Sequence, residues 1–238
     1  MELTRLNKYI SQTGFCSRRE ADALIEAKRV TVNGKLPELG TKVSDADDVR
    51  VDGKPIKEKA EAHYIAFNKP RGITCTTERH IRGNIIDYIN HPMRIFPIGR
   101  LDKDSEGLIF LTNDGDIVNK ILRAGNNHEK EYIVNVDRPV TEDFVKRMSN
   151  GIPILDTVTK KCLVEKTGSH QFRIILTQGL NRQIRRMCSY LDYDVVKLKR
   201  IRIMNISLGG LQMGEWRDFT PTEMNTINKL VADSSKTH

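Results

Sequence analysis

Two short apolar segments of the 238-residue chain enclose a strongly polar loop. The segments are 94–98 (RIFPI) and 108–112 (LIFLT), and the loop, 100–107 (RLDKDSEG), carries three carboxylates in five positions. Apolar runs of this length beside polar turns are typical of buried strands. A loop fixed at both ends by buried strands holds its side chains in defined places, so it can present one carboxylate at a cleft.

Three interpretations of this loop are open: a metal site, a solvated turn and a functional carboxylate. Asp102, Asp104 and Glu106 resemble the first half of a calcium-binding EF-hand loop. The bidentate glutamate of such a loop would fall on Asn113, an amide, so we expect no metal. Residues 103–106 are ordinary turn residues. Asp102 differs because it lies next to Leu101 at the end of an apolar strand, and it is the carboxylate that we expect at a cleft.

From Tyr64 onward, strand-like runs and amphipathic helices follow one another without regular alternation. The strand-like runs include 130–136 and 172–179, and the helical patterns include 116–125 and 181–191. A parallel βαβ fold would need strict alternation. We therefore expect 64–238 to form an α+β domain whose mixed, largely antiparallel sheet is flanked by helices.

The first 55 residues predict a separate small domain with two helices. Leu6, Tyr9 and Ile10 recur at helical spacing, and Ser17 with Glu20 forms a capping box for a second helix. Residues 30–35 (VTVNGK) predict a strand with an Asn-Gly turn, and 42–54 predict a further strand pair. The polar stretch 56–63 is a plausible linker.

The net charge of +8 and the pI of about 9.3 favour polyanionic partners, since neutralised phosphates release counterions. The four cysteines form no CxxC pair and have no histidine at zinc-ligand spacing, so we expect reduced thiols. No apolar signal core or membrane-length run is present. These features together predict a soluble cytoplasmic protein.

The first domain resembles the S4 RNA-binding domain. The resemblance covers about 4–50 and rests on RLNKYI (5–10), CSRREAD (16–22) and VNGK (32–35), in the order helix, helix, hairpin. In that family the two-helix face grips structured RNA through its phosphates. The resemblance thus implies an αα-hairpin head over 1–55 that binds RNA.

The remainder resembles the RsuA-type pseudouridine synthases. FPIGRLDKDSEGLIFLTNDG (96–115) looks like the signature of that family. Further stretches agree with it in order, namely NKPRGI (68–73), KEYIV (130–134), NRQIRRM (181–187) and VVKLKR (195–200). Within the family the chain is similar to the RluF-type synthases, which act on large-subunit rRNA and resemble enzymes that also modify a tRNA.

The resemblance implies isomerisation of uridine to pseudouridine in RNA, which needs no cofactor. Asp102 would be the nucleophile, by attack on C1′ or by assisting a glycal route. Arg185 would hold its charge as a forked ion pair. The Tyr132 ring would stack on the uracil, and its hydroxyl could help to remove the C5 proton. Considered alone, a tyrosine in such a strand is more often a core residue.

The resemblance also implies RNA contacts. Arg100 would occupy the space of the extruded nucleotide or contact its phosphate, and Lys69 has either a structural role or an RNA contact. Arg182 and Arg186, four residues apart on the predicted helix, would contact phosphates. In all, the residues assigned to RNA binding are Arg5, Lys8, Arg18, Arg19, Lys69, Arg100, Arg182, Arg186 and Leu198, the last as an apolar wall beneath the base.

Many relatives carry a basic residue where this chain has Leu180, so no phosphate contact is carried over to that position. The expected partners are structured rRNA, with a tRNA or a ribosomal subunit precursor as further candidates, and we expect a monomer. Two rival functions are a non-catalytic RNA-binding or ribosome-assembly protein and a nucleoside or glycoside hydrolase. The full set of Asp102, Tyr132 and Arg185 argues against the first, and a hydrolase would release free uracil.

Overall fold

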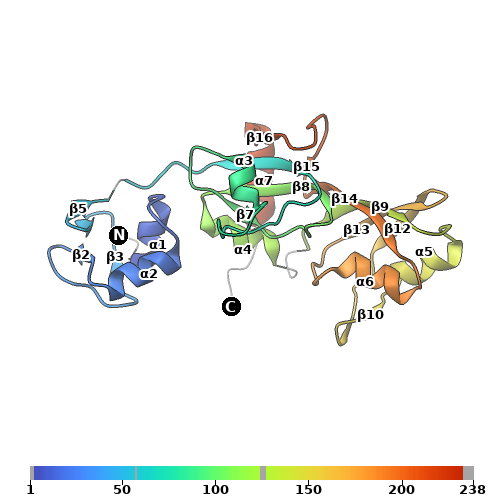
Figure 1. The fold of residues 1–238 in the computed structure, drawn as a ribbon, viewed down its shortest axis with the longest axis horizontal. Helices are drawn as coiled ribbons and strands as arrows, with labels where there is room; N and C mark the ends of the chain where they lie inside the picture. The colour runs from blue at the N-terminus through green and yellow to red at the C-terminus, as the bar shows by residue number, and fades with distance from the viewer. Residues whose placement is uncertain (1–2, 57, 124–126, 233–238) are drawn as a thin grey trace. The chain divides into compact units, whose positions relative to one another are not determined.

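The computed structural model describes residues 3–56, 58–123 and 127–232 (Figure 1). The chain divides into two compact units. The head comprises 1–63 with 92–94 and 113–115, and the body comprises the remaining residues. Over the described ranges, no helix combines the length and the apolar character that crossing a membrane requires.

The head contains the two predicted helices. Its elements are β1 (Thr4–Arg5), α1 (Leu6–Gln12), α2 (Arg18–Glu26), β2 (Val30–Val32), β3 (Lys42–Val43), β4 (Val49–Val51) and β5 (Lys54–Pro55). The capping box is confirmed, because the backbone N–H of Glu20 donates to Ser17 Oγ and the backbone N–H of Ser17 donates to the Glu20 carboxylate. Leu6, Ile10 and Ile25 are buried in the small core beneath the helices.

The predicted strand pairing in the head is partly wrong. Asn33 and Gly34 form the expected tight turn, with φ values of 49° and 76°. The chain does not continue as a strand beyond Lys35, since 36–41 contains a proline and a glycine that interrupt extended pairing. As a result β2 pairs with β4, and β3 pairs with β1 instead of with β4.

The body is the predicted α+β domain with a mixed, largely antiparallel sheet. The path through the sheet is β12-β13-β9-β14-β8-β6-β16, with β15 on β14 and β7 on β8, and the contact between β14 and β8 is parallel. The strands are β6 (Tyr64–Lys69), β7 (Phe96–Ile98), β8 (Glu106–Thr112), β9 (Lys130–Val136), β12 (Leu163–Gly168), β13 (Gln171–Leu176), β14 (Val195–Ile203), β15 (Ile206–Ser207) and β16 (Trp216–Asp218).

Five helices and one small hairpin complete the described part of the body (Figure 1). They are α3 (Ile85–Ile89), α4 (Gly115–Leu122), α5 (Glu142–Ser149), α6 (Gln183–Tyr190) and α7 (Pro221–Ala232), with the hairpin β10 (Pro153–Ile154) and β11 (Thr157–Val158). The predicted end of the helix at residue 125 lies outside the described residues.

The packing of β8 on both faces of the sheet explains why residues 108–111 are all apolar. Leu108 and Phe110 pack into the cluster that includes residues of α4 and α7. Ile109 and Leu111 point to the other side of the sheet and pack with residues of α3. Because neighbouring strand residues face opposite sides and both sides are covered, every residue of β8 is buried. The polar loop 99–105 is therefore attached to the most enclosed strand of the body.

Gly107 allows the parallel contact at the end of this loop. It pairs with Arg200 of β14 and has a φ of +107°, which disfavours any residue with a side chain. A Cβ atom at this position would lie 2.1 Å from the carbonyl oxygen of Arg200. The close approach joins the loop of Asp102 directly to β14.

We predict that Gly107→Ala lowers the free energy of unfolding by about 3 kcal/mol or more, because both the backbone conformation and the space exclude a methyl group. Urea denaturation measures the loss. Gly210→Ala is the matched control, since a Cβ there meets nothing within 4 Å. Similar midpoints for the two variants would contradict the role of the close contact.

Candidate active site

The loop that carries Asp102 is fastened by the segment after β6. The backbone N–H of Leu101 donates to Cys75 Sγ at 3.4 Å, and the Cys75 thiol donates to the carbonyl of Leu101 at 3.2 Å. The backbone N–H of Gly72 donates to the carbonyl of Lys103 at 2.7 Å. Burial raises the pKa of the Cys75 thiol, so the thiol stays neutral and serves as a brace. No pattern around Cys75 predicted this role.

Lys69 is a structural residue, which corrects the prediction that it contacts RNA. Its side chain has no exposed surface. The ammonium donates to the carbonyls of Pro70 at 2.8 Å and Ile73 at 2.9 Å, and lies 3.5 Å from that of Lys103. Burial lowers the pKa of this ammonium. Of the two roles that the sequence left open, the structure therefore favours the structural one.

Within the loop, the expectation of ordinary turn residues holds for two positions and fails for two. Lys103 and Asp104 are exposed. Ser105 and Glu106 are buried, because the chain enters β8 at this point. The Ser105 N–H donates to the carbonyl of Asp102 at 3.0 Å and closes the turn. The Glu106 carboxylate lies 3.1 Å from the ammonium of Lys197.

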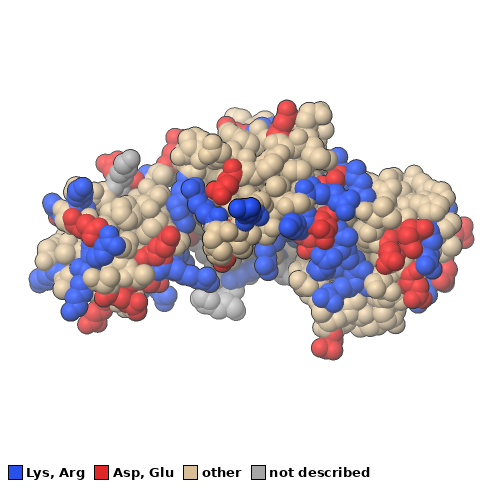
Figure 2. All heavy atoms as spheres, viewed as in Figure 1, with Lys and Arg blue, Asp and Glu red and all other residues tan. Residues whose placement is uncertain are grey.

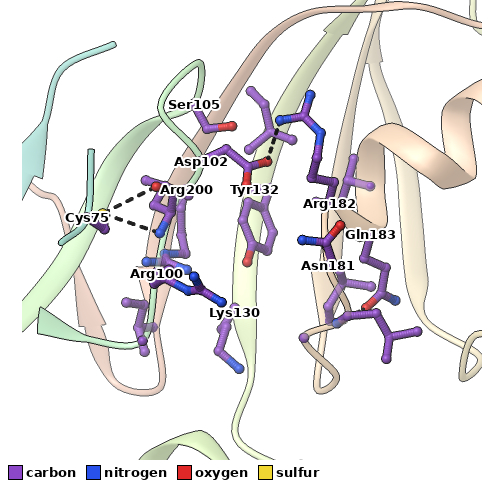
Figure 3. Close-up of a pocket in the computed structure, with 18 of the residues that line it drawn as sticks. Cys75, Arg100, Asp102, Ser105, Lys130, Tyr132, Asn181, Arg182, Gln183 and Arg200 are labelled. Carbon is purple, nitrogen blue, oxygen red and sulfur yellow. Dashed lines mark hydrogen bonds and ion pairs between the residues drawn. The ribbon is translucent and has the colours of Figure 1, made fainter. Parts of the chain in front are cut away.

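The carboxylate of Asp102 lies beside two guanidinium groups. Its Oδ2 is 3.6 Å from Nη1 of Arg182 and 3.7 Å from Nε of Arg185. Figure 3 shows Asp102 and Arg182 reaching toward each other from the two sides of the pocket. The Arg185 side chain is 17% exposed and that of Arg182 is 42% exposed. Both arginines therefore balance the carboxylate, whereas sequence reasoning reserved Arg182 for phosphate.

The difference arises from the start of α6. Arg182 is the N-cap residue, in the left-handed conformation with φ 48°, so it does not continue the helical stripe of Arg186. Arg186 instead donates from Nε and Nη2 to the carbonyl and the side-chain oxygen of Asn181. Arg186 remains exposed and Arg182 faces Asp102.

Ser105 orients Arg185. The Arg185 Nη2 donates to Ser105 Oγ at 3.0 Å, while the buried Nε has no hydrogen-bond partner in the described part of the chain. Burial lowers the pKa of Arg185, with the charge of Arg182 as a second cause and Asp102 opposing both. The hydroxyl thus holds one edge of the guanidinium while the other edge faces the carboxylate.

Tyr132, Leu198 and Arg200 form one wall of the site from two paired strands. Tyr132 of β9 is 8% exposed, and Leu198 of β14 is 5% exposed. Arg200 pairs with Tyr132 in the sheet, and its guanidinium carbon lies 5.9 Å from the ring centre. Its Nε donates to the carbonyl of Leu108 at 2.6 Å. Sequence reasoning found the first two residues and missed Arg200.

A cavity of about 710 Å³ is lined by Cys75, Asp102, Ser105, Tyr132, Arg182, Arg185, Leu198 and Arg200, among others. Its basic lining residues are Arg100, Lys103, Lys130, Arg182, Arg185 and Arg200, and Asp102 is the carboxylate in the lining. In Figure 2, Lys and Arg gather over the body between α4 and α6. No group of three His, Cys, Asp or Glu side chains within the described ranges could hold a metal ion. The cavity suits a polyanion with one neutral, planar group inside it.

The basic residues predicted in the head have mixed exposure. Arg18 and Arg19 are exposed in the first turn of α2. Arg5 is exposed in β1, directly before α1, and Lys8 is half-buried on α1. Arg5, Arg18 and Arg19 are therefore accessible on the surface of the head.

Comparison with known proteins identifies both units. The family described as RNA pseudouridylate synthase matches residues 63–190, and the S4 domain matches residues 4–49. A solved structure described as a crystal structure of pseudouridylate synthase aligns with a TM-score of 0.70 at 27% identity, over 94% of this chain and 99% of that chain.

Relatives agree over nearly the full length. The dual-specificity RNA pseudouridine synthase RluF of Salmonella typhi is 59% identical over 98% of this chain and 81% of its own. The ribosomal large subunit pseudouridine synthase B of Bacillus subtilis is 35% identical over 98% of this chain and 99% of its own. With a family match across more than half of its residues and relatives of this similarity, the chain belongs to the RNA pseudouridine synthases and carries an N-terminal S4 domain.

Proposed function

We propose that the protein isomerises a specific uridine to pseudouridine in large-subunit (23S) rRNA and accepts a tRNA as a second substrate. The Bacillus subtilis relative is named for the ribosomal large subunit, and the Salmonella typhi relative is named for dual specificity. The observation that carries the proposal is the carboxylate of Asp102 between Arg182 and Arg185 in a strongly basic cavity.

The geometry supports a division of roles among three residues. Asp102 acts on the ribose, either by attack on C1′ or by assisting a glycal route, and Arg185 pairs with its carboxylate. In both routes the N1–C1′ bond breaks and its electron pair leaves with uracil. C5 then bonds to C1′, which breaks any bond from Asp102 to that carbon, and C5 gives up its proton to the proposed acceptor, the phenolic oxygen of Tyr132. N1 of uracil, which kept the electron pair, takes up one proton, so atoms and electrons balance without a cofactor.

The uridine must leave its stack before it enters this cavity, which costs a few kcal/mol of unstacking. Arg100 is exposed at the rim and occupies the vacated space or contacts the phosphate. Arg186 is also exposed and is available to phosphates. Leu198 provides an apolar surface against the base on the same wall as the aromatic ring of Tyr132.

We further propose that the head grips structured RNA through Arg5, Lys8, Arg18 and Arg19, with 56–63 as the linker to the body. The substrate is free rRNA or a ribosomal subunit precursor, and the enzyme works as a monomer in the cytoplasm. The S4 match and the exposure of three of these four side chains support the grip.

Mapping of pseudouridine in total RNA tests the substrate assignment. A strain without this protein should lack one modification in large-subunit rRNA and one in a tRNA, and the wild-type gene should restore both. Restoration by a gene that encodes Asp102→Asn would contradict the proposed chemistry. If the strain without this protein keeps all its tRNA pseudouridines, tRNA is not a substrate, and the assignment to large-subunit rRNA still stands.

Asp102→Asn should reduce tritium release from RNA labelled at uridine C5 by at least about 1,000-fold, because the amide cannot act as a nucleophile. RNA affinity should stay within about threefold of the wild type. Free uracil as the product of the wild-type protein would indicate a hydrolase instead. Release that survives the substitution would show that another group is the nucleophile.

Ser105→Ala should lower the single-turnover rate by roughly 10- to 100-fold, since it removes a hydrogen bond to a charged group that aims Arg185 at Asp102. Ser105→Thr keeps the hydroxyl and should restore most of the rate. RNA affinity should be unchanged in both variants. Equal rates for alanine and threonine would contradict the orienting role.

The double variant Arg18→Gln/Arg19→Gln should weaken RNA binding and reduce the slope of log K against log salt by roughly 1–2, because each lost phosphate contact removes about 0.7–0.9 from the slope. Lys146→Gln/Lys166→Gln, which removes the same charge from exposed positions of the body, is the control. Equal slopes in the two double variants would argue against a grip by α2.

A further inference from the structure

The cavity continues past the reacting groups along β9. Lys130 precedes Tyr132 by two residues, so both side chains leave the same face of the strand, roughly 7 Å apart. Lys130 lines the cavity together with Gly99, Leu122 and Ile203. Figure 3 shows Lys130 and Arg100 near the hydroxyl end of Tyr132, whereas Asp102 lies toward its other end. The cavity therefore has a second region that the reaction at Asp102 does not use.

The ammonium of Lys130 has neither a hydrogen bond nor an ion pair within the described ranges. Its nearest carboxylates along the chain are engaged elsewhere. Glu131 binds Arg173 and Arg202, each at 2.6 Å, and Glu129 binds Arg202 at 2.9 Å. No acid on a neighbouring strand takes their place in the cavity, since Asp102 is the carboxylate in its lining.

The charges that face Lys130 are positive or neutral. Arg200 approaches from β14 and Arg100 from the connection between β7 and β8, while α4 contributes the apolar Ile121 and Leu122. The imidazole of His128, before β9, is also within electrostatic reach. Burial, with Arg200 as the second cause, lowers the pKa of Lys130 to about 8. A half-buried cation without a counter-charge is unfavourable, and a bound anion reduces that penalty.

We propose that Lys130, with Arg100 and Arg200, forms a second anion subsite that binds a backbone phosphodiester of the nucleotide next to the target uridine. The inference rests on the proposed RNA substrate. Phosphodiesters are the permanent anions of RNA, and the offset between Tyr132 and Lys130 along β9 suits a group one nucleotide away from the base held at Tyr132. The competing source of negative charge is uracil itself as it leaves C1′, which would make Lys130 a group of the chemical step.

Salt-dependent binding separates these sources. The probe is a transcript of large-subunit rRNA, and the variants are Lys130→Met, Lys130→Arg and the exposed control Lys166→Met. A phosphate contact predicts that Lys130→Met weakens affinity roughly tenfold and lowers the slope of log K against log salt by about 0.7–0.9. Lys130→Arg and Lys166→Met should match the wild type. An unchanged slope and affinity with a slower single-turnover rate would overturn the proposal in favour of the uracil source.

The pH dependence gives an independent readout. Only the protonated ammonium binds phosphate, so wild-type affinity should be constant below pH 7 and fall as the pH rises through about 8. Lys130→Arg stays charged and should lose this decline, whereas Lys130→Met should show weak binding without it. A wild-type decline that persists in Lys130→Arg would belong to another group and would count against the subsite. Thermal melting of each variant confirms that it is folded.

Neutral linkages identify the phosphate. Once the target uridine is mapped, we would make a set of synthetic hairpins, each with one flanking phosphodiester replaced by an uncharged methylphosphonate. For one hairpin of the set, the wild-type protein and Lys130→Met should bind with equal affinity, because the phosphate that Lys130 contacts has lost its charge. Lack of such a position would overturn the assignment. These measurements need binding and no turnover, so they remain decisive if the isomerase activity itself is not found.

Discussion

The site depends on a carboxylate and two guanidinium groups, and two distant segments of the chain bring each guanidinium within 4 Å of the carboxylate. Asp102 comes from the connection between β7 and β8, and both arginines come from the start of α6. Arg182 is largely open to solvent, where water and salt weaken its attraction, whereas Arg185 is mostly enclosed. Arg185 is therefore the less screened of the two charges that face the aspartate. Its charge is only useful if its direction is fixed, which is why a buried hydroxyl at Ser105 matters.

The scaffold concentrates its rigidity on the backbone around the aspartate. Cys75, Gly72 and Lys69 hold the carbonyl and amide groups on either side of Asp102 and leave its carboxylate free to face the cavity. These braces begin at the end of β6, and β6 pairs along its full length with β8. The same two strands thus supply the support for the loop and its anchor in the core. Pre-organisation of this kind lowers the reorganisation that the reaction would otherwise require.

The periodic features of the fold could be predicted from the sequence, and the isolated contacts could not. The helix pair, the capping box and the irregular order of strands and helices all leave patterns over several residues. Asp102, Tyr132 and Arg185 were found because they lie in ordered motifs. Ser105, Cys75 and Arg200 leave no such pattern, because their roles follow from burial beside segments far away in the chain. Lys69 misled for the same reason, since lysine is rarely found without exposed surface.

The contact between Gly107 and the main chain of Arg200 has an evolutionary consequence. Because Ile98 ends one core strand and Gly107 joins another, the connection between them has a fixed span to bridge. The side chains at positions 103 and 104 are exposed to solvent, so substitutions at these two positions are tolerated during evolution. The number of residues cannot drift, since one insertion would rotate the aspartate away from the arginines. Homologous proteins should therefore vary in the amino acids at positions 103 and 104 while the length of the loop stays constant.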